Sequence, residues 1–302
     1  MSLFLNHYPP QINSIVVFND ARKYLDKAPK SATRLDSANQ VWLCEFVDGE
    51  RVVLKYFDPS GHSKEHFDSE FRIFQLNPLS SALPNLLFSD SQRLLLGLEY
   101  IEQSKTPPVS IDSLIELAHE MTCGLLFDAD LHSHVPGIIG IWENHNVKLA
   151  VSEELLLSTA HASDPIESCL TRIVNLWKPD VHLHGDLKLA NLLFSDSSFR
   201  IIDWESHCLG PIHWDSAGLI QSCLLDSLAK GPYHEWSIQQ IPIIRLLLDE
   251  GPDELVDSVV ARLLQSSIEA SQTLDRISIL SANLLQLADF IARGDHSFMD
   301  AL

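Results

Sequence analysis

The sequence predicts an α+β protein built as two lobes. Strand-like runs and a hairpin turn dominate the first third of the chain, whereas helical periodicity dominates everything after residue 216. A third observation is the proline pair Pro107-Pro108, which separates the two patterns. We therefore expect an N-terminal lobe over residues 1–98, a hinge over 99–108 and a helical C-terminal lobe over 109–302.

The elements of the N-terminal lobe follow from alternation and turn residues. A short helix is expected over residues 19–26. The strand candidates are residues 33–35, 41–47, 51–57, 85–89 and 93–101. Asp48-Gly49 joins the second and third of these as a tight hairpin. Phenylalanines at helical spacing predict a helix over residues 64–76.

The C-terminal lobe is predicted to be mainly helical, and one motif-rich stretch interrupts its helices. A long helix is expected to begin at Ser110, and residues 130–146 look like a polar loop. The remaining predicted helices are residues 165–177, 217–230, 237–249, 254–272 and 274–293.

Composition excludes several classes of protein. The formal net charge of −20 argues against a duplex nucleic-acid binder and against docking on an anionic membrane. The same charge would suit a cationic small molecule through steering. Five widely spaced cysteines and no recognisable signal peptide indicate a reducing, cytoplasmic setting.

Residues 181–215 contain the highest concentration of candidate catalytic and metal-binding motifs. The run His184-Gly-Asp-Leu-Lys-Leu-Ala-Asn191 matches a catalytic-loop pattern, and Arg200-Ile-Ile-Asp-Trp-Glu205 follows as an apolar strand ending in an aspartate. Phosphoryl transfer needs a carboxylate beside the attacking hydroxyl and oxygen ligands for magnesium. Asp186 and Asn191 are close enough in sequence for one loop to aim both inward. Glu205 is open to two interpretations: it contacts a second metal ion or a cationic substrate, or it caps a helix or turn.

With these motifs the chain resembles the aminoglycoside phosphotransferase family of the protein-kinase-like superfamily. The resemblance rests on His184-Gly-Asp186, Asn191, Ile202-Asp-Trp-Glu205 and Trp214-Asp215. It implies a protein-kinase-like two-lobed fold, with an antiparallel sheet plus a helix in the N-lobe and a mainly helical C-lobe. It also implies ATP and Mg²⁺ as cofactors, with GTP left open, and a hydroxyl group of a small molecule as acceptor.

The resemblance assigns roles to the catalytic region. Asp186 would act as catalytic base or orient the acceptor hydroxyl, and His184 would brace its loop. Asn191 and Asp203 would bind magnesium. Asp215 would fix the segment that follows the metal-binding aspartate.

The same resemblance assigns nucleotide contacts in the N-lobe. Lys55 would contact the α- and β-phosphates, and Glu70 would pair with Lys55. Glu99, Tyr100 and Ile101 would face the adenine through their backbone groups. Ser37 and Ala38 stand in the turn that covers the nucleotide, where the usual glycines are missing.

Lys188 departs from many small-molecule members of the family. A cation at this position would stabilise charge on the transferring phosphoryl group, so we count Lys188 among the catalytic residues. It also keeps a peptide Ser or Thr open as the acceptor, and with it a protein partner. The glycine-free turn keeps a third reading open, a catalytically weak nucleotide-binding scaffold.

Overall fold

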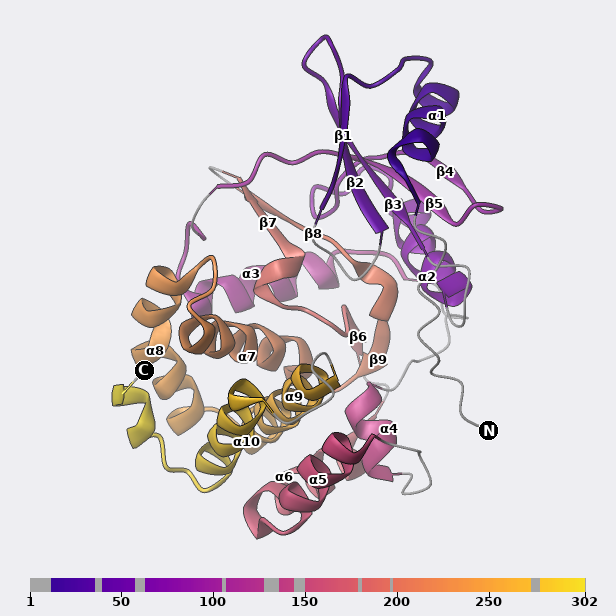
Figure 1. The fold of residues 1–302 in the computed structure, drawn as a ribbon. Helices are drawn as coiled ribbons and strands as arrows, with labels where there is room; N and C mark the ends of the chain where they lie inside the picture. The colour runs from indigo at the N-terminus through magenta and orange to yellow at the C-terminus, as the bar shows by residue number, and fades with distance from the viewer. Residues whose placement is uncertain are drawn as a thin grey trace. The chain divides into compact units, whose positions relative to one another are not determined.

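The computed structural model describes residues 12–35, 40–57, 63–104, 107–127, 136–143, 150–178, 181–195, 198–272 and 278–301. The chain divides into two compact units. The first comprises Met1–Gln103, Leu125–Leu131 and Phe199–Ser206, and the second comprises Ser104–Gly124, His132–Ser198 and His207–Leu302. An antiparallel sheet characterises the first unit and helices the second, so the predicted α+β fold class is confirmed (Figure 1).

The first unit is organised by a five-stranded antiparallel sheet of order β1-β2-β3-β5-β4. Its strands are β1 (Ser31–Arg34), β2 (Gln40–Glu45), β3 (Arg51–Tyr56), β4 (Leu86–Asp90) and β5 (Leu95–Glu99). The predicted hairpin joins β2 to β3, with Glu45 opposite Arg51. Gly49 takes a φ of +87°, a left-handed conformation that glycine adopts without strain.

Helix α1 (Ser14–Leu25) covers one face of this sheet and begins earlier than predicted. Asn13 explains the earlier start, because its side chain accepts a hydrogen bond from the backbone N of Val16 at 3.1 Å. Val17 and Ala21 then pack against alternate residues of β3, among them Leu54. Lys55 lies between these residues in sequence, so its side chain points to the opposite face of the sheet.

Helix α2 (Ser63–Leu76) buries Phe67 and Phe74, as the spacing predicted. A distant stretch of chain joins it in the first unit, formed by most of β8 (Ser198–Ile201) and by the short helix η2 (Trp204–Ser206). The backbone N of Ile201 donates to the carbonyl of Ala82 at 2.8 Å. The indole of Trp204 is fully buried. The end of β8 is thereby fixed within the first unit.

The second unit is mainly helical. Its long helices are α3 (Ile111–Cys123), α5 (Val151–His161), α6 (Asp164–Leu176), α7 (His213–Ala229), α8 (His234–Glu250), α9 (Asp253–Gln272) and α10 (Ile279–Ala292). Its short elements are α4 (Gly137–Glu143), β6 (Val181–Leu183), η1 (Leu189–Asn191), β7 (Leu192–Ser195), β9 (Cys208–Gly210) and η3 (Ser297–Ala301). Helix α9 packs against α6, α7 and α10, and it buries residues around most of its circumference.

One predicted loop contains a helix instead. Residues 130–146 were expected to be loop, but α4 lies at 137–143 and buries Ile138, Ile139 and Trp142. Two glycines in this heptapeptide lower its intrinsic helix propensity, so tertiary packing forms the helix rather than local preference. No helix within the described ranges combines the length and apolar character needed to cross a membrane.

Candidate active site

A buried lysine is the centre of the candidate site in the first unit. Lys55 on β3 is 5% exposed. Its Nζ lies 2.5 Å from Oε2 of Glu70, a residue of α2 that is also buried. The same ammonium forms an ion pair with Asp203 and lies 3.6 Å from Oε2 of Glu205. One cation thus faces three carboxylates, and the predicted partner Glu70 is one of them.

Asp203 and Glu205 owe their positions to the turn that follows β8. Asp203 has a φ of +69°, a left-handed conformation that aspartate tolerates better than most residues. The indole of Trp204 donates to the carbonyl of Ile201 at 3.0 Å. The carbonyl of Trp204 accepts from the hydroxyl of Ser69 on α2 at 3.4 Å. These bonds hold the turn on both sides of Asp203.

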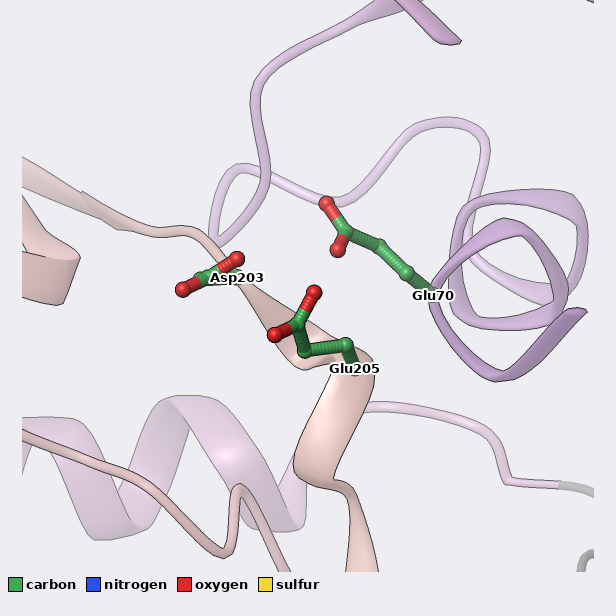
Figure 2. A group of neighbouring side chains, drawn as sticks. All are labelled: Glu70, Asp203 and Glu205. Carbon is green, nitrogen blue, oxygen red and sulfur yellow. The ribbon is translucent and has the colours of Figure 1, made fainter. Parts of the chain in front are cut away.

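The three carboxylates converge in space (Figure 2). One oxygen of each lies within 4.8 Å of an oxygen of the others. Carboxylate oxygens are hard donors, which suit Mg²⁺ better than nitrogen or sulfur ligands do. The donor set therefore fits a divalent cation, with Asp203 as the ligand that the sequence predicted.

Burial and neighbouring charges shift the pKa values of Lys55 and Glu70 in opposite directions. Burial would lower the pKa of Lys55, but the carboxylates of Glu70, Asp203 and Glu205 outweigh it and raise that pKa above its ordinary value. Burial raises the pKa of Glu70 to about 7, against the lowering effect of Lys55. Lys55 is therefore firmly protonated, and burial disfavours the charged form of Glu70 by raising its pKa.

The catalytic-loop motif lies in the second unit, between β6 and β7. The carboxylate of Asp215 on α7 accepts from the backbone N of His184 at 2.7 Å and from that of Gly185 at 3.0 Å. The indole of Trp214 donates to the carbonyl of Gly185 at 3.0 Å. Gly185 takes a φ of +83°, a left-handed conformation that glycine adopts without strain. The start of the loop is anchored to the first turn of α7.

Asp186 forms contacts through both its side chain and its backbone. Its Oδ2 lies 2.6 Å from Nζ of Lys188, and its Oδ1 lies 3.0 Å from a terminal guanidinium nitrogen of Arg262 on α9. Its carbonyl accepts from the amide nitrogen of Asn191 at 2.9 Å. Its backbone N donates to Nδ1 of His184 at 3.3 Å. All four predicted loop residues therefore lie together.

The pKa values of Asp186 and Asp215 are shifted in opposite directions. Burial would raise the pKa of Asp186, but Arg262 and Lys188 bring it below its ordinary value. Burial dominates at Asp215 and raises its pKa, although two backbone donors favour its charged form. Asp186 is thus held as an anion that both cations contact.

The family model of the phosphotransferase enzyme family matches residues 32–236, more than half of the chain. The chain belongs to this family. It is accordingly a phosphotransferase, a kinase with an alcohol group as acceptor. The family resemblance carried by the motifs is confirmed.

Several solved kinases share the fold of this phosphotransferase. Choline kinase LicA from Streptococcus pneumoniae is 15% identical, with a TM-score of 0.62 over 93% of this chain and 98% of its own. Amicoumacin kinase hAmiN is 14% identical, with a TM-score of 0.59 and 94% of each chain covered. Aminoglycoside phosphotransferase APH(4)-Ia is 13% identical, with a TM-score of 0.60 over 93% of this chain and 99% of its own. No curated protein shows significant sequence similarity to the chain.

The predicted nucleotide-facing residues of the phosphotransferase are only partly described. Ser37 and Ala38 lie outside the described residues. Glu99 ends β5, and its carboxylate accepts from the side-chain amide of Asn85 at 2.7 Å. The guanidinium of Arg51 lies 4.2 Å from the ring centre of Tyr100. The side chains of Glu99 and Tyr100 therefore contact other residues of the first unit. Ile101 is the next residue in the sequence.

Sequence reasoning missed Arg262. The motif residues are neighbours in sequence, whereas Arg262 lies in α9 and contacts Asp186 from 76 positions away. One signal was present in the sequence: Arg262 is the only basic residue of α9, and it lies between the apolar residues Ala261 and Leu263. A lone arginine in a buried stretch indicates a paired charge.

Proposed function

We propose that this phosphotransferase uses ATP and Mg²⁺ to phosphorylate a hydroxyl group of a small molecule. The observation that carries the proposal is the buried ammonium of Lys55, tied to Glu70 and paired with Asp203. A fixed cation beside hard oxygen ligands is the combination that binding of a metal–nucleotide complex requires.

The proposal assigns a role in nucleotide binding to each of the following residues. Lys55, oriented by Glu70, binds the phosphates. Asn191 and Asp203 hold magnesium, Asn191 through its amide oxygen because its nitrogen donates to Asp186. Magnesium, when bound, offsets the negative charge of the phosphate oxygens. The nucleotide-facing positions are Ser37, Ala38, Glu99, Tyr100 and Ile101.

Transfer is assigned to the loop of the second unit. Asp186 orients the acceptor hydroxyl and accepts its proton as the oxygen–phosphorus bond forms, while the bond from the γ-phosphorus to the β–γ bridging oxygen breaks and ADP leaves. Lys188 is 38% exposed, so it is able to leave Asp186 and stabilise charge on the transferring group. His184 braces the loop through its contact with the backbone N of Asp186.

The acceptor class is proposed from the fold relatives and from charge. The relatives include kinases named for choline and for aminoglycosides, which are amino alcohols. A net charge of −20 would attract such cations. We place the reaction in the cytoplasm because all five cysteines are free thiols, which persist in a reducing compartment.

The first test needs no acceptor. Thermal unfolding is followed with ATP and with GTP, each with and without Mg²⁺, for the wild type and for Asp203→Asn. Asparagine tolerates the left-handed backbone at residue 203, so the variant removes charge and spares conformation. Asp48→Asn, at the exposed hairpin turn, is the matched control.

We expect a Mg²⁺-dependent rise in the unfolding temperature for the wild type and the control. At a nucleotide concentration of 100 times Kd, mass action stabilises the native state by about 2.7 kcal/mol. Asp203→Asn should lose most of the Mg²⁺-dependent part. No shift with either nucleotide would contradict nucleotide binding, and with it both the proposed function and the nucleotide-binding scaffold.

The second test screens acceptors. ADP release is measured with choline, hygromycin B, amicoumacin and a Ser/Thr peptide pool. Acceptor-dependent release with an amino alcohol supports the proposal. Release with the peptide pool alone would overturn the small-molecule assignment.

A further inference from the structure

The buried guanidinium of Arg262, on helix α9, contacts the catalytic loop. The Arg262 side chain is 4% exposed, and its two terminal nitrogens contact successive residues of the loop. One lies 3.4 Å from the carbonyl oxygen of Gly185, and the other lies 3.0 Å from Oδ1 of Asp186. The guanidinium therefore contacts both the backbone and the carboxylate of the residue pair at the centre of the motif.

The surroundings of Arg262 are shaped to receive it. The guanidinium carbon lies 5.4 Å from the ring centre of Trp214, which itself donates to the carbonyl of Gly185. Gly218 on α7 leaves the necessary space. A Cβ at position 218 would lie 3.1 Å from a terminal nitrogen of Arg262 and would overlap the carbonyl oxygen of Leu187. Side chains of α7 and α9 thus form one cradle for the loop.

Arg262 and Lys188 contact Asp186 in different ways. Arg262 binds Oδ1 from a buried helix, whereas Lys188 binds Oδ2 from the loop itself and is 38% exposed. An arginine fork anchored at two points restricts the carboxylate more than a flexible, exposed lysine does. Burying a guanidinium also carries a desolvation cost, which its contacts with Asp186 and Gly185 offset.

We propose that Arg262 is a positioning residue for phosphoryl transfer. It fixes Oδ1 of Asp186, so that Oδ2 is the oxygen presented to the acceptor hydroxyl once Lys188 turns to the transferring group. This inference rests on the proposed function, in which Asp186 orients the acceptor. It adds α9 to the machinery of the reaction.

The test compares kcat and KM for ATP across five proteins: wild type, Arg262→Met, Arg262→Lys, Asp186→Asn and the double variant Asp186→Asn/Arg262→Met. Turnover is followed as ADP release with Mg²⁺-ATP and the amino alcohol that the acceptor screen identifies, and as acceptor-free ATP hydrolysis. Methionine keeps the length of the apolar stem and removes the fork. Lysine restores one charged contact but not the second bond.

A matched control contacts the same helix from a neighbouring one. Arg172 on α6 pairs with the buried Asp257 of α9 through two contacts, at 2.9 and 2.6 Å. Arg172→Met removes a two-point arginine contact to α9 away from the loop. Thermal unfolding of every variant reports its stability separately from its turnover.

We expect Arg262→Met to lower kcat about 100-fold with KM for ATP little changed, because a misplaced reacting group has that order of effect. Arg262→Lys should recover part of kcat. The double variant should be no slower than Asp186→Asn alone, because a residue that acts through Asp186 has nothing left to position. Arg172→Met should lower the unfolding temperature and keep kcat.

The opposite outcomes are distinguishable. A folded Arg262→Met protein with wild-type kcat, or a double variant whose losses multiply, would overturn the positioning role alone. An equal loss of kcat in Arg172→Met would show that general loosening of α9 explains the effect. Wild-type turnover in Asp186→Asn would instead contradict the proposed function.

Discussion

The two compact units each contain an ion cluster, and the clusters have opposite signs. In the first unit one ammonium, Lys55, faces three carboxylates. In the second unit one carboxylate, Asp186, lies between the two cations Lys188 and Arg262. Each cluster is a charged group with more counter-charge around it than neutrality requires.

This difference in charge indicates the sign of the ion that each cluster attracts. The surplus of carboxylates in the first unit attracts a cation, which in the proposed reaction is magnesium. The surplus of positive charge in the second unit attracts an anion, which in the proposed reaction is the transferring phosphoryl group. Both clusters also keep their central group ionised, since the pKa of Lys55 is raised and that of Asp186 is lowered.

The largest expected effect comes from removing the central charge of the second cluster. Asp186→Asn keeps the shape of the side chain but leaves two cations without their carboxylate. We expect turnover to fall about 10³-fold, the range of a general base or orienting group, while ATP binding persists. ADP release and a nucleotide thermal shift measure the two properties. A comparable loss of both would mean that the residue supports folding rather than transfer.

Removing the central charge of the first cluster should act mainly on stability. Lys55→Met removes the cation that contacts Glu70, Asp203 and Glu205, and breaking such a buried pair costs about 3–5 kcal/mol. Urea unfolding measures the loss. Nucleotide binding should weaken as well, and a variant as stable as wild type would contradict the buried-cluster argument.

The same variant has a pH dependence of predictable sign. Burial already raises the pKa of Glu70 to about 7, and loss of Lys55 removes its lowering effect. The native state then binds more protons than the unfolded state above the ordinary pKa of a glutamate, so stability falls as pH rises. Lowering the pH from about 8 to about 6 should return part of the lost stability relative to wild type. A loss that is independent of pH would break the electrostatic explanation.

A smaller effect is expected where α7 touches the catalytic loop. Gly218→Ala places a methyl group against Arg262 and the carbonyl of Leu187. Overpacking of this kind costs about 1–3 kcal/mol, and it should also reduce turnover through the displaced loop. Gly140→Ala in α4 is the control, since nothing lies within 4 Å of its added Cβ. That substitution should be neutral or slightly stabilising in thermal unfolding.

The smallest expected effect on stability tests whether burial, rather than the number of paired charges, distinguishes the cluster of the first unit. Lys27 also contacts two carboxylates, those of Asp48 and Glu50, but all three side chains are substantially exposed. Lys27→Met should change stability little, and the change should disappear in high salt because exposed pairs are screened. A loss as large as that of Lys55→Met would show that burial is not what distinguishes the cluster of the first unit.

Much of the fold could be predicted because local signals agreed with it. Asp48-Gly49 predicted the hairpin that carries Lys55, and the spaced phenylalanines predicted α2. Helices α4 and α5 were not predicted. The first contains two glycines, and the second places Leu155, Leu156 and Leu157 in a row rather than at helical spacing. Their existence depends on packing against the rest of the second unit, which periodicity does not register.

The candidate site divides in the same way. Residues of the catalytic loop could be predicted because five positions of sequence hold Asp186 and Asn191 in one turn. The left-handed backbone of Asp203 and the reach of Arg262 could not, because both are set by tertiary structure. Sequence spacing therefore predicted the candidate residues of the loop, but it did not predict the contact from Arg262 or the backbone conformation of Asp203.

The first unit is assembled from three separated stretches of chain, and this has a consequence for biosynthesis. Trp204 is fully buried there, and the ring of Phe127 lies 6.2 Å from it. A nascent polypeptide that has emerged only as far as residue 103 lacks both rings, and α2 lacks its neighbour η2. The sheet can form early in translation, but the acidic turn beside Lys55 is added only after Ser206 has left the ribosome. Because synthesis proceeds from the N-terminus, the unit whose sheet is made first is completed only when residues much later in the sequence have been synthesised.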